Sequence, residues 1–194
     1  MPAEESDEAI VREIQRGLRR RLADLYERHR RRLYGYLLRA AHDPALADDV
    51  FQEAWMKVIE RVDGFDPARG SFRAWIYRIA SNALIDRARY DTVRRGAELD
   101  APVAETEGVR RIDLQPSPEA GPDRRAASSE AGRSLDEALV RLPPRQRLAV
   151  LLRHQQGLSY KELAVALRAP EGTAKALVHR GVHALRELMG DNPL

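Results

Sequence analysis

Apolar residues recur at helical spacing through the first ninety or so positions of the chain, and no segment there alternates as a strand would. Between Leu22 and Leu37 the apolar positions fall three or four residues apart. Asp43 followed by Pro44 then predicts a helix start, because aspartate caps helices and proline suits the first helical position. The helix beyond it is expected to bury one face, made by Leu46, Ala47, Val50, Phe51, Ala54, Trp55 and Val58.

A further helix is expected over about residues 72–94. Turn-forming residues between Asp63 and Gly70 mark a loop, and Ser71 is placed to cap the helix that follows it. Its predicted buried face consists of Phe72, Ile76, Ile79, Ala80 and Ala83.

The C-terminal block carries three helix-start signals. Ser134 to Glu137 has the pattern of a capping box and predicts a helix that opens at Ser134. Pro143 and Pro144 predict a second helix, which ends near residue 157. Ser159 and Glu162 form another capping box.

The last of these signals opens a short helix, after which a tight turn leads into a longer helix from Glu171 to about Met189, with Gly190 as its C-terminal cap. A short capped helix, a turn and a longer helix is the pattern of a helix-turn-helix motif.

Between the two blocks, residues 96–133 are rich in proline and glycine and show no periodicity. The pattern predicts an all-α fold with two small helical domains, residues 1–95 and 134–194, joined by a flexible linker over 96–133. Such a linker has an r.m.s. span of roughly 30–35 Å. It would let the two domains bind sites one to two DNA turns apart.

The amino-acid composition narrows the range of functions that the protein could have. The 194 residues include no cysteine, which excludes disulfides, thiol nucleophiles and thiolate metal sites and fits the cytoplasm. No apolar run is long enough to span a bilayer, and the first residues are acidic, without a signal peptide. Of the 33 basic residues all but Lys57, Lys161 and Lys175 are arginine. Arginine suits phosphate binding, although a GC-rich genome would also produce this bias.

The outward face of the last helix is the first candidate site. It carries small and basic side chains that suit a DNA major groove, although an ordinary solvated face would look the same. These residues are Thr173, Lys175, Ala176, His179, Arg180, His183 and Arg186. The pair His179 and His183 lacks a third ligand, so no metal is expected.

Two more surfaces carry candidate chemistry. On the helix of residues 72–94, Trp75, Arg78, Asn82 and Arg89 share a strip that could stack and hold single-stranded nucleic acid. The alternative is that Trp75 closes the edge of the core. On the preceding helix an acidic strip suggests a protein partner, or a merely solvated face; it consists of Asp49, Gln52, Glu53 and Glu60.

Catalytic motifs are missing from the sequence. It has no Walker pattern, no dinucleotide-binding glycine motif and no zinc-protease motif, so neither an enzyme nor a cofactor is expected.

Taken in order, these segments resemble a bacterial RNA polymerase sigma factor of the extracytoplasmic-function group. Asp49 to Trp55 is similar to the region 2 segment that docks on the clamp helices of polymerase β′. Residues 72–82 with Asp86 and Arg87 resemble the segment that melts and reads the −10 element. Residues 142–147 and 157–164 resemble region 4, in which residues 171–175 open the helix for the −35 element.

This resemblance implies partners and site residues. The partners would be core RNA polymerase, through the β′ clamp helices and the β flap, together with promoter DNA and an anti-sigma factor. Core binding would fall to Asp49, Gln52 and Glu53, and −35 binding to the outward face of the last helix. The −10 site would be Phe65, Trp75, Arg78, Asn82 and Arg89, with a flipped base trapped beside the loop of residues 63–71.

The chain also departs from the family. Ala176 and Leu177 stand where many members carry a serine and an arginine, and residues 181–183 replace a stretch that is usually arginine-rich. Weak −35 binding is therefore expected. Two other classes remain open at this stage: a non-sigma regulator that uses only its helix-turn-helix, and a helical protein-binding adaptor.

Overall fold

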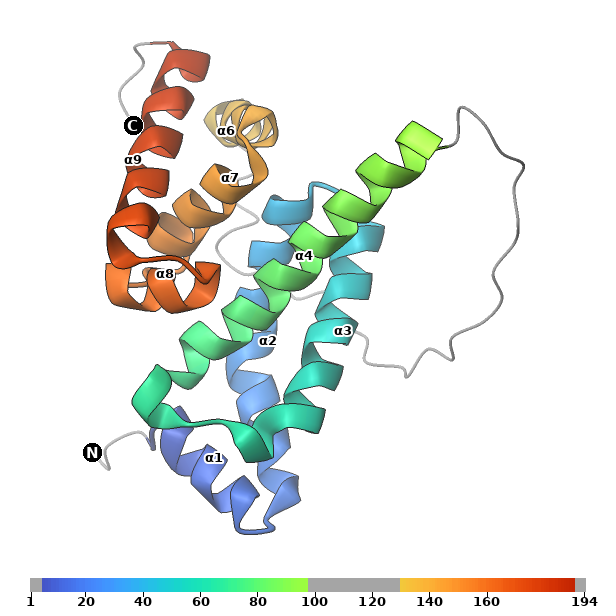
Figure 1. Cartoon of the computed structure of the whole chain (residues 1–194), viewed down its shortest axis with the longest axis vertical. Coiled ribbons are helices and arrows are strands. Elements are labelled where there is room, and N and C mark those ends of the chain that lie inside the picture. Colours follow the sequence, from blue (N-terminus) through green and yellow to red (C-terminus); the bar gives the residue numbers. More distant parts are fainter. Residues whose placement is uncertain (1–4, 98–129, 191–194) are drawn as a thin grey trace.

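The computed structural model describes residues 5–97 and 130–190, and within those ranges every regular element is helical (Figure 1). The predicted all-α class is therefore confirmed. The N-terminal block contains α1 (Asp7–Gln15), α2 (Leu22–Ala41), α3 (Pro44–Arg61) and α4 (Phe72–Ala97), with the short 3₁₀ turns η1 (Arg19–Arg21), η2 (Val62–Gly64) and η3 (Pro67–Arg69). The C-terminal block contains α6 (Glu130–Arg141), α7 (Pro144–Val150), η4 (Leu151–Gln155), α8 (Tyr160–Leu167) and α9 (Glu171–Met189).

Local capping chemistry sets several helix starts, as predicted. The Asp43 carboxylate accepts the backbone N–H groups of Ala45 and Leu46 ahead of α3. The Ser71 hydroxyl accepts the N–H of Ala74 at 3.2 Å at the start of α4. Ser159 forms the complete capping box with Glu162 that opens α8. Each cap satisfies N–H groups that a helix leaves free at its first turn.

Two predicted boundaries are wrong. The capping box at Ser134 does not start a helix, because α6 begins at Glu130 and Ser134 lies inside it. Glu130 and Ala131 are good helix formers, and they extend the helix in front of a cap signal that is only four residues long. At the other end α4 continues to Ala97. Both ends of the predicted linker are thus helical, and residues 98–129 lie outside the described residues.

Large side chains fill the N-terminal core between α2, α3 and α4. Tyr36 and Tyr77 meet edge to face with ring centroids 5.3 Å apart, and the Tyr36 and Ser81 hydroxyls hydrogen-bond at 2.8 Å. The predicted inward faces of α3 and α4 are buried, with Leu46 only half-buried. The C-terminal block packs against two of these helices, α2 and α4.

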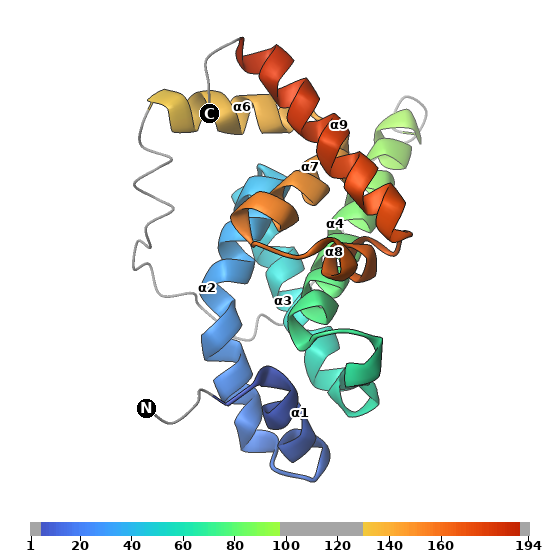
Figure 2. The same cartoon turned by 90° about the vertical axis from the view of Figure 1, so that its left-hand side faces the viewer.

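The two blocks pack directly on each other. Helix α8 lies against α4, and α2 contacts η4 and α6 (Figures 1 and 2). Gly70, with φ 143°, sits at the contact: a Cβ there would lie 3.4 Å from the Val165 methyl groups. No local pattern indicates this packing, because the residues that make it are far apart along the chain.

Polar contacts fasten the junction between the blocks. Tyr77 donates its hydroxyl to Gln156 Oε1 at 2.6 Å, and Arg73 donates to the Gln156 carbonyl at 2.7 Å. The Ser71 hydroxyl donates to the Glu162 carboxylate at 3.0 Å. A wide π-helical turn, η4, ends directly before Gln156, whose N–H donates to the carbonyl of Leu151. This turn presents Gln156 to α4, and we call the arrangement the closed form.

Candidate functional site

The face of α9 predicted to bind DNA is exposed in the closed form. Behind it, Ala174, Leu177 and Val178 are buried, and Leu185 and Gly181 continue the buried side. We call the exposed side the α9 surface; it comprises Thr173, Lys175, Ala176, His179, Arg180, His183 and Arg186. The placement predicted for all seven residues is confirmed.

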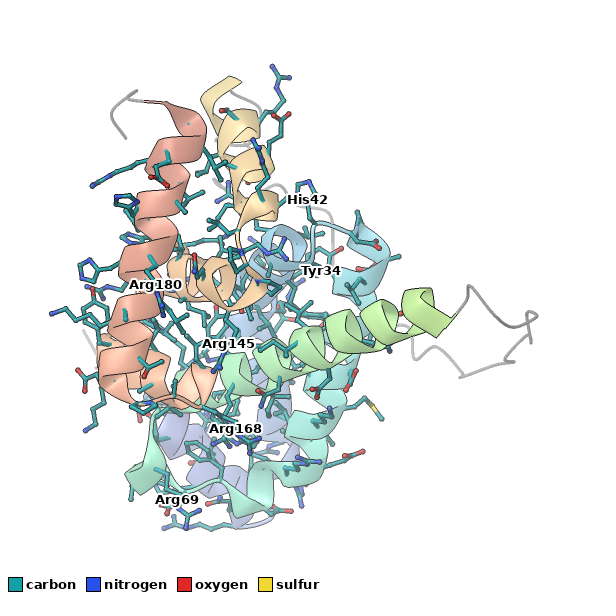
Figure 3. All side chains as sticks on the ribbon, turned by 45° about the horizontal axis from the view of Figure 1, so that its top comes forward. Tyr34, His42, Arg69, Arg145, Arg168 and Arg180 are labelled. Atoms are coloured by element: carbon teal, nitrogen blue, oxygen red, sulfur yellow. The ribbon has the colours of Figure 1, made fainter. Side chains whose placement is uncertain are left out.

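The turn between α8 and α9, which sets the direction of α9, is fixed by contacts within the protein. Arg168 adopts a left-handed conformation with φ 49° and ends α8, and Pro170 precedes α9. Arg145 on α7 donates to the Leu167 carbonyl at 3.0 Å and so fixes the end of α8. Figure 3 shows Arg145, Arg168 and Arg180 on these three elements. A rigidly supported helix with a small, basic outer face can enter a major groove.

Gly181 explains one of the departures in sequence. A Cβ at this position would lie 2.5 Å from a methyl of Val150 and 3.2 Å from the Gln146 carbonyl oxygen. The glycine therefore lets α9 cross close to α7, and a larger residue would push them apart. A requirement of packing, rather than of DNA contact, accounts for glycine here.

The acidic strip on α3 lies away from the core, as predicted, and surrounds apolar side chains. Asp49 and Glu60 are exposed, whereas Gln52 and Glu53 are half-buried. Met56 and Ile59 on the same side are 42% and 48% exposed. We call these six residues the α3 surface: Asp49, Gln52, Glu53, Met56, Ile59 and Glu60.

Sequence reasoning missed Met56 and Ile59. The signal that could have found them is their position, since both fall outside the apolar stripe that α3 buries. An apolar centre with a polar rim is the anatomy of a protein-binding surface, and a merely solvated face would lack the apolar part. Lys57 at the edge pairs with Glu53 at 2.5 Å and holds that carboxylate in place.

The aromatic residues assigned to the −10 site lie in the core. Trp75 is 8% exposed and Phe65 7%. The ring centroids of Phe65 and Trp75 lie 5.9 and 5.7 Å from that of Phe72 and 5.4 Å from each other. For Trp75 the structure therefore supports the alternative reading, in which it closes the core edge. In this form both rings are almost fully buried, which leaves little surface for a stacked base.

The polar members of the α4 strip are more accessible. Arg78 and Asn82 are half-buried, and the side chain of Arg89 lies outside the described residues. Burial lowers the pKa of Arg78, and the nearby positive charge of Arg168 lowers it further. The helix-turn-helix turn thus approaches the strip, and α8 covers the loop end at Gly70 and Ser71.

The described residues offer no metal centre. Among them no three histidine, aspartate or glutamate side chains gather around a common point. His183 instead faces Glu187, 3.6 Å away on the same helix. In residues 5–97 and 130–190, none of the helices has the length and apolar character that a bilayer crossing requires.

Family comparisons define the class of both blocks. A family model of Sigma-70 region 2 matches residues 25–93, and one of Sigma-70, region 4 matches residues 132–185. The chain is 30% identical over 181 residues to the ECF RNA polymerase sigma factor SigW of Bacillus subtilis, covering 93% of this chain and 95% of SigW. It is 31% identical over 191 residues to the RNA polymerase sigma-H factor of Pseudomonas aeruginosa, covering 95% and 94%.

Solved structures share the fold. CnrH in complex with the cytosolic domain of CnrY is similar with a TM-score of 0.68 and 22% identity, over 97% of this chain and all of that one. The sigma factor RpoE in complex with the anti-sigma factor NepR from Bartonella quintana gives a TM-score of 0.62 and 21% identity, over 88% and 99%.

The two blocks thus correspond to the two domains of a sigma-70-type initiation factor, with region 2 before region 4 in the chain. The chain belongs to the extracytoplasmic-function (ECF) sigma factors. As such it directs RNA polymerase to promoters for transcription initiation, binds core polymerase and DNA, and performs no catalysis of its own.

Proposed function

We propose that the α3 surface docks on the β′ clamp helices of core RNA polymerase. The observation that carries this assignment is the exposed pair Met56 and Ile59 within an acidic rim. Apolar contact would supply most of the affinity, and Asp49 would give orientation and speed of association. The β flap would bind the C-terminal block, and the complex would work in the cytoplasm.

Promoter reading is divided between the α9 surface and α4. Lys175 and Thr173 near the start of α9 would reach base edges of the −35 element, with Arg180 on the phosphates. Arg78, Asn82 and Arg89 on α4 would hold the −10 strand. Phe65 and Trp75 would support the loop of residues 63–71 from beneath instead of stacking on a base in the closed form.

The closed form must open for both elements to be read. Sites one to two DNA turns apart are ~35–70 Å apart, whereas α8 packs directly on α4 here. One of the similar solved structures is a sigma factor in complex with an anti-sigma factor. We propose that this chain too is held by such a protein until polymerase is needed.

Comigration with core polymerase on a sizing column tests the docking surface. Asp49→Arg and Met56→Asp should each weaken core binding about tenfold or more, while the helical content of the free protein stays unchanged. Arg12→Asp on the exposed side of α1 is a matched charge control and should bind normally. Normal binding by both α3 variants would remove the assignment.

Permanganate reactivity of promoter thymines tests the role of α4. Asn82→Ala should reduce melting more strongly than it reduces core binding, because the α3 surface lies on a different helix. If melting is unchanged and the variant simply unfolds more readily, Asn82 is a structural residue.

A further inference from the structure

A cavity of about 510 Å³ lies where the two blocks meet. This volume is within the range of small-molecule sites, roughly 300–1,000 Å³. Its wall combines the start of α1, the middle of α2, the first turns of α4 and one residue of the C-terminal block. The lining residues are Glu5, Ser6, Asp7, Arg28, His29, Arg32, Arg73, Tyr77 and Gln156. None of them is aliphatic, so the cavity suits a polar ligand.

The two acidic side chains of the wall already have cationic or imidazole partners. Asp7 accepts from Arg28 at 3.1 Å and lies 2.7 Å from the Nε2 of the buried His29. Burial acts to raise the pKa of Asp7, but His29 and Arg28 outweigh it and bring the pKa below its ordinary value. The Glu5 carboxylate is held by Arg21 at 2.5 Å. Neither acid is free to neutralise the remaining arginines.

Arg32 and Arg73 are left with unused binding capacity. Among the described residues, neither forms an ion pair with a carboxylate, although the charge of Arg73 is close enough to Glu162 to help lower the pKa of that carboxyl. Arg73 Nη2 donates to the Gln156 carbonyl, but its Nε is buried without a hydrogen-bond partner. Both guanidinium charges also act on Tyr77, whose pKa burial raises and they lower, so both lie around this ring.

A buried guanidinium N–H without an acceptor is costly, and an unplaced ion is one of the ordinary explanations. Guanidinium groups bind phosphate through paired N–H donors, more strongly than they bind neutral oxygen. We propose that this cavity binds a small phosphate-bearing anion, such as pyrophosphate or the polyphosphate part of a nucleotide, between Arg32 and Arg73.

Ligand binding here would be linked to domain packing. Gln156 belongs to the C-terminal block and the other lining residues belong to the N-terminal block, so the site is complete only in the closed form. A ligand at 100 times its dissociation constant would shift the balance toward the closed form about 100-fold. The effect on promoter melting rests on the proposed function, whereas binding of the ligand to the free chain does not.

Calorimetric titration of the full chain with sodium pyrophosphate tests the site. Saturable one-to-one binding and a rise in melting temperature are expected, compared with sodium chloride at equal ionic strength. Arg32→Gln should lower the affinity at least about tenfold, because it removes the guanidinium group that would bind the phosphate. Since Arg32 is exposed, the substitution should leave the fold intact. Arg61→Gln, exposed at the end of α3 and outside the cavity, should bind like the parent.

Parallel titrations with inorganic phosphate and with ATP distinguish a simple ion from a nucleotide as the source of the phosphate group. Equal affinity of the parent and Arg32→Gln would overturn the proposal, as would a melting shift that sodium chloride reproduces. A final arm adds core polymerase and promoter DNA: pyrophosphate should reduce the permanganate reactivity of promoter thymines with the parent but not with Arg32→Gln. If the chain binds pyrophosphate but never binds core, the proposed docking fails while the site stands.

Discussion

Gln156 is the residue whose removal should open the closed form. Its side chain accepts the hydroxyl of Tyr77, which is 2% exposed, and its carbonyl accepts from Arg73. Gln156→Ala leaves the carbonyl bond in place but removes the acceptor of the tyrosine hydroxyl, which then has only water in the adjoining cavity as a partner. Exchanging a hydrogen bond within the protein for one to water costs about 0.5–1.5 kcal/mol. The ratio of open to closed chain should therefore rise about 2- to 12-fold.

Energy transfer between two dyes measures the opening directly. The chain has no cysteine, so Arg61→Cys on α3 and Glu187→Cys on α9 can be labelled without further changes. Gln156→Ala in this background should lower the transfer efficiency while each block keeps its helical content. Gln155→Ala is the matched control, because both polar atoms of that neighbouring amide are buried without a partner.

A double-mutant cycle decides whether the contact itself is responsible. Tyr77→Phe removes the donor, and the double variant with Gln156→Ala should open no further than the less stable single variant. Strictly additive effects, or transfer efficiencies equal to those of the parent and of Gln155→Ala, would refute the reasoning. The packing would then rest on apolar contact alone.

Three further outcomes follow from the same contacts. Hydrogen bonds outweigh burial and lower the pKa of Glu162, so its contribution to stability is complete above the ordinary value of 4.5 and is lost as the pH falls through the lowered pKa. Denaturant titrations should show this loss, and Glu162→Gln should not. Gly181→Ala should destabilise the chain by about 1–3 kcal/mol in thermal melts, because Val150 cannot move freely. Replacing His179 and His183 by alanine should weaken promoter binding, measured by fluorescence anisotropy, and unchanged affinity would exclude them from the DNA contact.

Local chemistry made much of this fold predictable. The caps at Asp43, Ser71 and Ser159 need only residues within one helical turn, so the sequence contains the whole signal. The inward and outward faces of α9 follow from helical periodicity alone. The same method failed at Ser134, where the residues before the cap were themselves able to extend the helix.

Contacts between distant residues were not predictable in the same way. The hydrogen bonds from Tyr77 and Arg73 to Gln156 join residues 79 and 83 positions apart. No periodicity marks them, and the π-helical turn that aims Gln156 has no short-range signature comparable to a cap. The prediction of site residues is limited in a similar way, as Trp75 illustrates. A tryptophan at the edge of an apolar stripe fits a core and a binding face equally well, and its packing against Phe65 shows which of the two it joins.

Helix α4 links the two halves of the proposed function. Its first turns pack on the C-terminal block through Arg73 and Tyr77, while Arg78 and Asn82 follow one turn later. The α3 surface and the α9 surface stay exposed in the same form, so polymerase and duplex DNA can both reach the closed chain. On the proposed assignment, only the −10 contacts would require α8 to leave α4. Docking should therefore come before melting, and every ligand that favours the closed form should act on the melting step.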